Sequence, residues 1–202
     1  MLKIYYTNAS LLPEMEIVMR KETFVGRLLL AKAIADEGLV YNPDMILKNE
    51  HGKPYLSYSD DFFFNISHSG DYIVCTVSDT EVGIDVQKLR KFSETIALRY
   101  FHPNEAKMLE TLEDKSDYFF TLWTAKEAYL KYLGSGLSGG LNSFEVVMFE
   151  GLYKIRENFN ILPVVLHSCF LEDGYKCFVC SLQDISPQLI EVRFDKGIPQ
   201  FE

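Results

Sequence analysis

Hydrophobic residues recur along this chain with two spacings, and each spacing predicts one type of element. Short apolar or alternating segments predict strands at 1–6, 62–66, 72–77, 80–87, 144–149, 162–170, 175–182 and 189–194. Apolar rows at helical spacing predict helices over 20–37, 93–100, 104–112 and 118–133. Because helices and antiparallel strands are mixed along the chain, the pattern indicates an α+β fold.

The two halves of the chain have a similar make-up, since each contains one long helix together with several strands. The long helix of the first half, 20–37, is followed by Gly38, and the long helix of the second half, 118–133, is followed by Gly134. Glycine is the common stop signal at a helix end. We therefore predict two α+β lobes, residues 1–92 and residues 93–202. Each lobe is expected to be an antiparallel sheet packed with its long helix.

The composition excludes several classes of protein. A net charge of -9 over 202 residues argues against a broad nucleic-acid-binding surface. No uninterrupted apolar run approaches membrane-spanning length. Residues 1–6 lack the charged start and apolar core of a signal peptide, so we expect a cytoplasmic protein.

The four cysteines indicate neither a disulfide framework nor a zinc site. Cys177 and Cys180 have the spacing of a redox motif, but they fall in a predicted strand, where their side chains point to opposite faces. No second paired cluster exists to complete a zinc site. We expect all four to be buried free thiols.

An aspartate interrupts the β-branched strand at 80–87. Val82, Ile84 and Val86 face one side of this strand, and Asp85 lies on the other side. Aspartate is rare in such strands, and Gly83 leaves room for a close approach of another group beside it. The segment therefore indicates a functional position. The alternative is an edge strand whose outer face is wet.

Two further features carry candidate chemistry. Glu127 and Lys131 lie one turn apart on the helix 118–133, either as part of a site or as an exposed ion pair worth roughly 0.2–0.5 kcal/mol. Ser67 and His68 follow an aromatic strand in what reads as a small polar turn that can contact an anion. Asp85 and Glu127 are hard oxygen ligands of the kind Mg²⁺ prefers, if the fold brings them together.

These segments, taken in order, resemble the 4′-phosphopantetheinyl transferases, and in particular the larger, monomeric type that activates surfactin synthetase. The matching segments are 52–54 (GKP), 64–69 (FNISHS), 83–86 (GIDV), 101–105 (FHPNE), 123–128 (WTAKEA) with Lys131, and 134–137 (GSGL). The resemblance covers about residues 52 to 144. It implies a fold of two similar lobes related by a pseudo-twofold axis. It also implies transfer of 4′-phosphopantetheine from coenzyme A to a serine of an apo acyl or peptidyl carrier protein, releasing adenosine 3′,5′-bisphosphate.

The same resemblance assigns roles to the reacting groups. Asp85 and Glu127 are the implied Mg²⁺ ligands, and Glu105 is the implied general base for the serine proton. Lys131 matches the lysine that contacts the transferring pyrophosphate, and Lys126 its companion.

The coenzyme contacts are also implied by the resemblance. Ser67 and His68 match positions at the 3′-phosphate of coenzyme A, and Lys53 matches a further contact. Gln87 departs from the pattern, because an acidic residue is usual two positions after the aspartate. A neutral amide oxygen is a weaker third ligand, so the change bears on the affinity for the metal.

The implied partners are coenzyme A and an apo carrier protein, and the implied state is a monomer. Carrier proteins are acidic around their serine, so a basic and apolar patch is expected, with Lys88, Arg90, Lys91 and Arg99 as candidates. The same four residues can equally be a solvated surface. Two alternatives remain open: a non-catalytic module that binds coenzyme A, and a metal-dependent phosphate-ester hydrolase.

Overall fold

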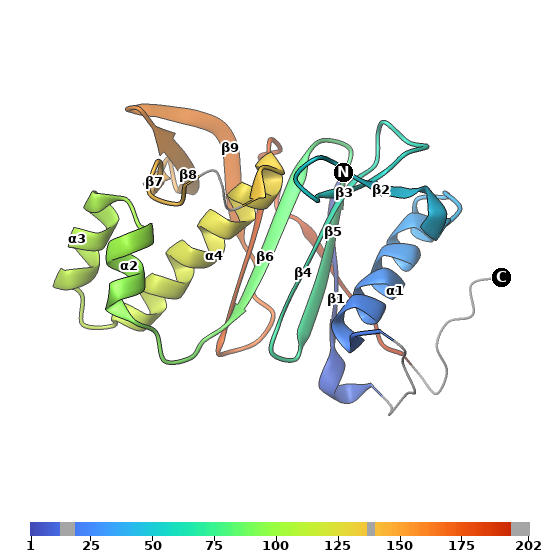
Figure 1. The fold of residues 1–202 in the computed structure, drawn as a ribbon, viewed down its shortest axis with the longest axis horizontal. Coiled ribbons are helices and arrows are strands. Elements are labelled where there is room, and N and C mark those ends of the chain that lie inside the picture. The colour runs from blue at the N-terminus through green and yellow to red at the C-terminus, as the bar shows by residue number, and fades with distance from the viewer. Residues whose placement is uncertain (13–18, 137–139, 195–202) are drawn as a thin grey trace.

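The structure is a computed structural model that describes residues 1–12, 19–136 and 140–194 (Figure 1). It confirms the predicted α+β class. The helices are α1 (Lys21–Asp36), α2 (Glu94–Tyr100), α3 (Pro103–Thr111) and α4 (Lys115–Leu133), with two short 3-10 helices at Ala9–Leu11 and Pro43–Met45. The strands are β1 (Leu2–Asn8), β2 (Ile46–Lys48), β3 (Pro54–Leu56), β4 (Phe63–Ser69), β5 (Tyr72–Ser78), β6 (Val82–Lys88), β7 (Glu145–Phe149), β8 (Leu152–Glu157), β9 (Asn160–Ser168), β10 (Tyr175–Ser181) and β11 (Gln188–Glu191).

The first sheet has the strand order β11-β1-β5-β4, and α1 packs against one side of it (Figure 1). Val25, Leu29 and Ala33 of α1 recur at helical spacing and are buried against this sheet, which is why the segment forms a helix. β11 runs parallel to β1, so a strand from the end of the chain completes the sheet of the first half.

The second sheet has the order β6-β10-β9-β8-β7, and α4 packs on β6 and β10. α4 begins at an Asp114 cap, which accepts a hydrogen bond from the backbone N–H of Asp117, and it ends at Gly134. Gly134 has a φ of 65°, so the predicted glycine stop is confirmed. β6 belongs to the first half by sequence but to the second sheet by pairing. The division of the chain at residue 92 stays a prediction.

Several local predictions differ from the structure. The hairpin β2–β3 and the strand β8 were not predicted. β2 and β3 have three residues each, too few to show alternation. The prediction of a polar turn at Ser67 and His68 is wrong, because β4 continues to Ser69 and the turn follows at Gly70 and Asp71. All four cysteines are free and buried, as predicted.

No helix in the described ranges is both long and apolar enough to cross a membrane.

Candidate active site

β6 is held along both of its edges at the centre of the molecule, between α4 and β4 (Figure 1). One edge pairs with β10 in an antiparallel ladder. Along the other edge, three side chains of β4 accept hydrogen bonds from backbone N–H groups of β6: Asn65 from Ile84 at 3.0 Å, Ser67 from Val86 at 3.4 Å and Ser69 from Lys88 at 3.0 Å. These three residues share one face of β4 because side chains alternate along a strand. The polar residues that suggested a turn in the sequence are therefore hydrogen-bond acceptors for the backbone of the neighbouring strand β6.

α4 lies directly on the backbone of β6 at Gly83. A Cβ atom at this position would lie 2.2 Å from the backbone nitrogen of Tyr132 and 2.3 Å from the carbonyl oxygen of Ala128. Only glycine allows this approach, so the expected close contact beside Asp85 is the backbone of α4 itself. The contact brings Glu127 and Lys131 of α4 to the strand that carries Asp85.

Asp85 is 2% exposed and has three polar partners. Its Oδ1 accepts hydrogen bonds from Ser67 Oγ at 2.8 Å and from Lys131 Nζ at 2.6 Å. Its Oδ2 accepts a hydrogen bond from Gln87 Nε2 at 2.9 Å. This burial excludes the alternative of a wet edge strand. Lys131 therefore pairs with Asp85 of another element, and the alternative of an exposed pair with Glu127 is also wrong.

Glu127 is half-buried and makes no hydrogen bond or ion pair with any other described residue. Burial, and then the negative charge of Asp85, raise the pKa of the Glu127 carboxyl, while Lys131 opposes that shift. The effect of the Asp85 charge on Glu127 places the two carboxyl groups in one electrostatic site. Two acidic groups and a single lysine leave this site short of positive charge.

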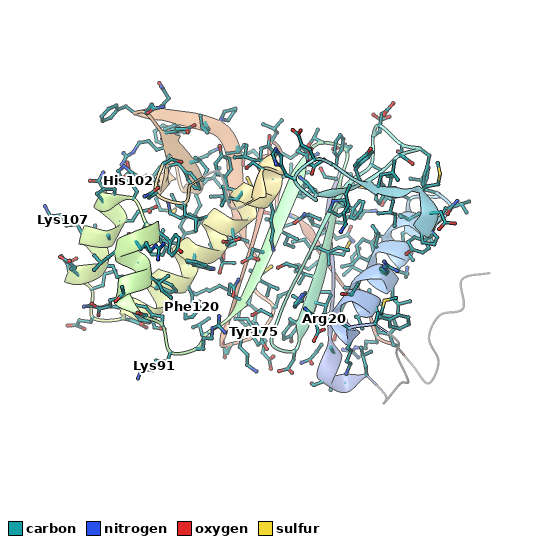
Figure 2. The ribbon with its side chains drawn as sticks, viewed as in Figure 1. Arg20, Lys91, His102, Lys107, Phe120 and Tyr175 are labelled. Atoms are coloured by element: carbon teal, nitrogen blue, oxygen red, sulfur yellow. The ribbon has the colours of Figure 1, made fainter. Side chains whose placement is uncertain are left out.

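Glu127 lines two cavities. The smaller cavity, of about 300 Å³, is lined by His51, Gly52, Lys53, Pro54, Asn65, Glu127, Leu130, Lys131, Gly134 and Gly136. The larger cavity, of about 770 Å³, is lined by Gln87, Arg90, Lys91, Phe92, Ser93, Ile96, Phe119, Phe120, Trp123 and Glu127. Lys91 and Phe120 of the larger cavity lie near the end of β6, where the chain passes to α2 (Figure 2). Glu127 is thus the residue that these two lining sets share.

Lys53 is partly buried between the start of β6 and the end of α4. Its Nζ pairs with Glu81 and donates to the carbonyl oxygens of Val82 at 2.9 Å and Tyr132 at 3.0 Å. Burial lowers the pKa of Lys53, and Glu81 opposes the shift. Lys53 therefore satisfies a carbonyl in the last turn of α4 as well as lining the smaller cavity.

The structure separates Ser67 from His68, because adjacent residues of β4 point to opposite faces. Ser67 belongs to the Asp85 group, whereas His68 is exposed and lines a third cavity, the α1 cavity, of about 320 Å³. Arg27 of α1 and Lys48 of β2 line the same cavity. The sequence assigned no role to Arg27 and did not indicate Lys48 as a site residue. The only signal for Lys48 was its position shortly before the 52–54 (GKP) turn.

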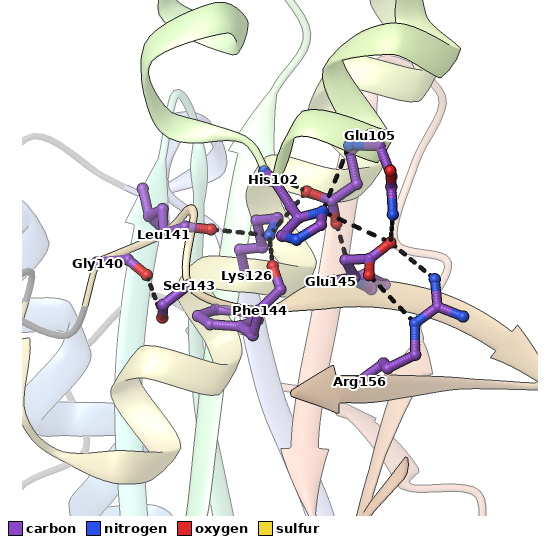
Figure 3. A network of polar contacts seen from close by, with 11 residues as sticks. His102, Glu105, Lys126, Gly140, Leu141, Ser143, Phe144, Glu145 and Arg156 are labelled. Atoms are coloured by element: carbon purple, nitrogen blue, oxygen red, sulfur yellow. Dashed lines mark hydrogen bonds and ion pairs between the residues drawn. The ribbon is translucent and has the colours of Figure 1, made fainter. Parts of the chain in front are cut away.

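Glu105 and Lys126 form a separate buried pair in the core of the second half (Figure 3). Glu105 Oε1 accepts from the backbone of Val146 at 2.7 Å, and Oε2 accepts from the backbone of His102 at 3.0 Å and from Lys126 at 2.8 Å. Burial raises the pKa of Glu105 and lowers the pKa of Lys126, while their pairing opposes both shifts.

Lys126 also fastens the segment that follows α4. Its Nζ donates to the carbonyl oxygens of Leu141 at 2.8 Å and Phe144 at 2.6 Å. Within the described residues, no hydrogen bond or ion pair connects Lys126 or Glu105 to the Asp85 group. Their roles as phosphate contact and general base stay predictions.

Comparison with known proteins identifies the class to which this fold and site belong. Residues 81–180 match the family model described as "4'-phosphopantetheinyl transferase superfamily", and residues 17–80 match the model "4'-phosphopantetheinyl transferase, N-terminal". The chain belongs to the 4′-phosphopantetheinyl transferase superfamily.

Its relatives confirm the surfactin-synthetase-activating type within that superfamily. It is 36% identical to 4'-phosphopantetheinyl transferase gsp of Aneurinibacillus migulanus, over 79% of this chain and 68% of that protein. It is 32% identical to 4'-phosphopantetheinyl transferase Sfp of Bacillus subtilis (strain 168), over 82% of this chain and 76% of that protein. Among solved structures it is similar to the holo-[acyl-carrier-protein] synthase of Thermotoga maritima, with a TM-score of 0.41, 23% identity, and coverage of 50% of this chain and 61% of that one.

Proposed function

We propose that this protein transfers the 4′-phosphopantetheine group of coenzyme A to a serine of an apo carrier protein. The observation that carries the proposal is that Glu127 lines both cavities and so forms a junction between them, with Lys131 in the smaller cavity and the buried Asp85 close enough to raise the pKa of Glu127. A transferase with two substrates needs such a junction, because the pyrophosphate and the serine must meet at one point. In the superfamily to which the chain belongs, this is the established reaction class.

The residues at the junction fit a magnesium ion. Asp85 and Glu127 are hard carboxylate ligands, and Glu127 has no partner among the described residues. Gln87 donates its amide N–H to Asp85, which leaves its oxygen as a third donor. No cluster of three His, Cys, Asp or Glu side chains suited to a metal occurs within 1–12, 19–136 and 140–194, so two acidic ligands are all that the described chain offers. Mg²⁺ is commonly held by one or two carboxylates, with substrate phosphate and water in the other positions.

When bound, the ion would supply neutralisation of charge on the pyrophosphate oxygens. The protein's own residues do the rest. The serine oxygen forms a bond to the phosphorus that carries pantetheine, and the bond from that phosphorus to the bridging oxygen breaks, so adenosine 3′,5′-bisphosphate leaves with the electron pair. Lys131, which lines the smaller cavity, holds the pyrophosphate and neutralises the leaving oxygen.

The serine proton requires an acceptor, and Glu105 is the residue assigned to it by resemblance. Both of its oxygens accept hydrogen bonds in the structure, and its side chain is almost fully buried. To act as the base, Glu105 would have to leave Lys126 and become exposed. A positioning role for the pair, holding the segment after α4, agrees with every contact described here.

The coenzyme and the carrier are assigned to different cavities. Arg27 and Lys48 give the α1 cavity two positive charges against the one negative charge of Glu22, and His68 adds an imidazole that can hydrogen-bond a phosphate group of coenzyme A. Lys53 lines the smaller cavity, which shares Pro54 with the α1 cavity. Ser67 is placed with Asp85 and not with His68. The partner of the larger cavity is then the carrier protein.

The larger cavity has the chemistry expected for an acidic carrier. Arg90 and Lys91 supply positive charge, and Phe92, Ile96 and Trp123 supply apolar surface. Of the other two basic candidates, Lys88 pairs with Asp71, and Arg99 lies over the ring of Tyr100. We further propose that the protein acts as a monomer in the cytoplasm.

One experiment separates the transferase from its alternatives. The protein is mixed with coenzyme A, Mg²⁺ and a panel of apo carrier proteins, and the mass of each carrier is measured. A transferase adds one phosphopantetheine mass to a carrier serine, whereas a non-catalytic module leaves every carrier unchanged. A hydrolase releases adenosine 3′,5′-bisphosphate from coenzyme A in the absence of a carrier.

A matched pair of variants tests the site. Asp85→Asn is expected to abolish transfer, because it removes a buried ligand charge and the partner of Lys131. Asp71→Asn makes the same change at an exposed aspartate and is the control for it. Transfer by Asp85→Asn at the rate of the control would refute the assignment of the metal site.

A further inference from the structure

Lys131 occupies the position on Asp85 at which a metal ion would be expected. Its ammonium lies 2.6 Å from Asp85 Oδ1, and the same oxygen accepts a hydrogen bond from Ser67. Ser67 Oγ in turn accepts a hydrogen bond from Lys131 Nζ at 2.8 Å. The three groups form a closed triangle, so the lysine is held in place by two partners.

A divalent cation and an ammonium cannot share this carboxylate oxygen without strong repulsion between their like charges. Asp85 Oδ1 already carries the Lys131 ammonium, whereas Oδ2 accepts one hydrogen bond from the neutral Gln87 amide, so a metal ion on this carboxylate would lie close to the ammonium. Asp85 is buried, which weakens the screening of that repulsion by water. Metal binding therefore requires Lys131 to move away from Asp85.

Lys131 has room to make this movement. It lies in the last turn of α4, its side chain is 29% exposed, and it lines the smaller cavity assigned above to the pyrophosphate. A phosphate group in this cavity is a new partner for the ammonium. Coenzyme A then draws Lys131 away from Asp85 and leaves Oδ1 available to the metal.

We propose that Lys131 is a built-in counter-ion of Asp85 in the free protein. The divalent ion must displace Lys131, and this lysine thereby couples metal binding to coenzyme A binding. This inference rests on the transferase function proposed above, and it adds that the two ligands bind cooperatively through one lysine. Because coupling between two ligands is reciprocal, the metal must strengthen coenzyme A binding by the same factor.

The test measures Mn²⁺ binding to the full chain without turnover. Free Mn²⁺ is quantified by electron paramagnetic resonance during a titration, with and without coenzyme A and with no carrier present. For the wild type, coenzyme A is expected to tighten Mn²⁺ binding by about tenfold. Lys131→Met is expected to bind Mn²⁺ about tenfold more tightly than the wild type in the absence of coenzyme A, and to show a smaller tightening on addition of coenzyme A, because only the phosphate ligands of the coenzyme then contribute to it. The transfer rate of the same variant falls, because the pyrophosphate loses its lysine.

Lys88→Met is the matched control. Like Lys131→Met, it removes one positive charge and breaks a lysine–aspartate ion pair, here between Lys88 and Asp71. Lys88 lies on β6, three residues after Asp85, but its ion pair is exposed. Its Mn²⁺ affinity is expected to equal that of the wild type. Lys131→Gln repeats the test with a polar side chain, and circular dichroism establishes that each variant is folded.

The possible outcomes are distinct. Mn²⁺ affinity of folded Lys131→Met or Lys131→Gln that is equal to or weaker than that of the wild type overturns the inference, and so does equal tightening in Lys88→Met, which would be an effect of net charge alone. Absence of Mn²⁺ binding in every protein also overturns it. A wild type that shows the coupling but modifies no carrier refutes the proposed transfer and leaves the counter-ion role standing.

Discussion

Gly83 offers the sharpest test of how the fold builds the site. In Gly83→Ala the new Cβ would lie 2.2 Å from the backbone nitrogen of Tyr132, whereas ordinary van der Waals contact begins at 3.4 Å. The obstructing atoms are backbone, so no side chain can rotate to relieve the contact. α4 must therefore move away from β6 by roughly 1 Å, the scale of misplacement that can reduce an enzyme's rate about 100-fold.

The expected cost has two parts. Overpacking of this kind destabilises a protein by about 1–3 kcal/mol. The displaced segment of α4 carries Glu127 and Lys131, so the turnover number is expected to fall by about 100-fold even where the protein is fully folded. Urea unfolding followed by the fluorescence of Trp123, the single tryptophan, gives the stability. The initial rate of carrier modification with saturating coenzyme A and Mg²⁺ gives the turnover number.

Gly151→Ala is the matched control. Gly151 lies in the turn between β7 and β8 with a φ of 81° and nothing within 4 Å of an added Cβ. Its replacement costs about 1–2 kcal/mol through the left-handed backbone and moves no element of the site. If Gly83→Ala loses no more activity than this control, or keeps wild-type stability, the close contact of α4 with β6 does not position the reacting groups.

Three further changes test individual side chains. Because burial and Asp85 raise the pKa of Glu127 in the folded protein, its ionisation above about pH 4.3 opposes folding. Glu127→Gln should therefore raise the melting temperature at pH 8 and leave it unchanged near pH 3.5; a decrease at pH 8 would contradict this. Gln87→Glu should tighten Mg²⁺ binding in a titration of activity, yet lower the metal-free melting temperature by placing a second carboxylate beside Asp85; an unchanged titration rejects the first part. Glu105→Gln should lower the free energy of unfolding by about 3–5 kcal/mol, because it leaves the Lys126 ammonium buried and unpaired. A near-zero loss in urea unfolding would show that the pair does not anchor the core, and loss of one limb of the pH–rate profile would assign Glu105 as the base.

The local features of the site could be read from the sequence because they depend on neighbours along the chain. The alternation around Asp85 placed it on the face of β6 opposite Val82 and Val86, and the glycine beside it indicated a close approach. The spacing of Glu127 and Lys131 placed them on one side of a helix that ends at a glycine. Ordered motifs also identified the family, since several short segments in sequence are far more specific than any one.

Contacts between distant segments were decided only in the folded protein. Periodicity shows which residues share a face but not which face meets which, so Lys131 could equally pair with Glu127 on its own helix or with Asp85 on β6. The structure decides for Asp85, because the missing side chain of Gly83 lets α4 lie on that strand. Strand alternation likewise divides Ser67 from His68.

The sheets show the same division between sequence and tertiary structure. Hydrophobic patterns predicted most strands, but not that β6 would leave the sheet of its own half or that β11 would return to β1. Those pairings depend on backbone hydrogen bonds between segments far apart in the sequence, such as Lys88 with Tyr175 and Lys3 with Gln188, and the pattern of side chains does not determine them. The sequence by itself determined the elements, the family and the candidate chemistry; the three-dimensional packing decided which charges neutralise one another.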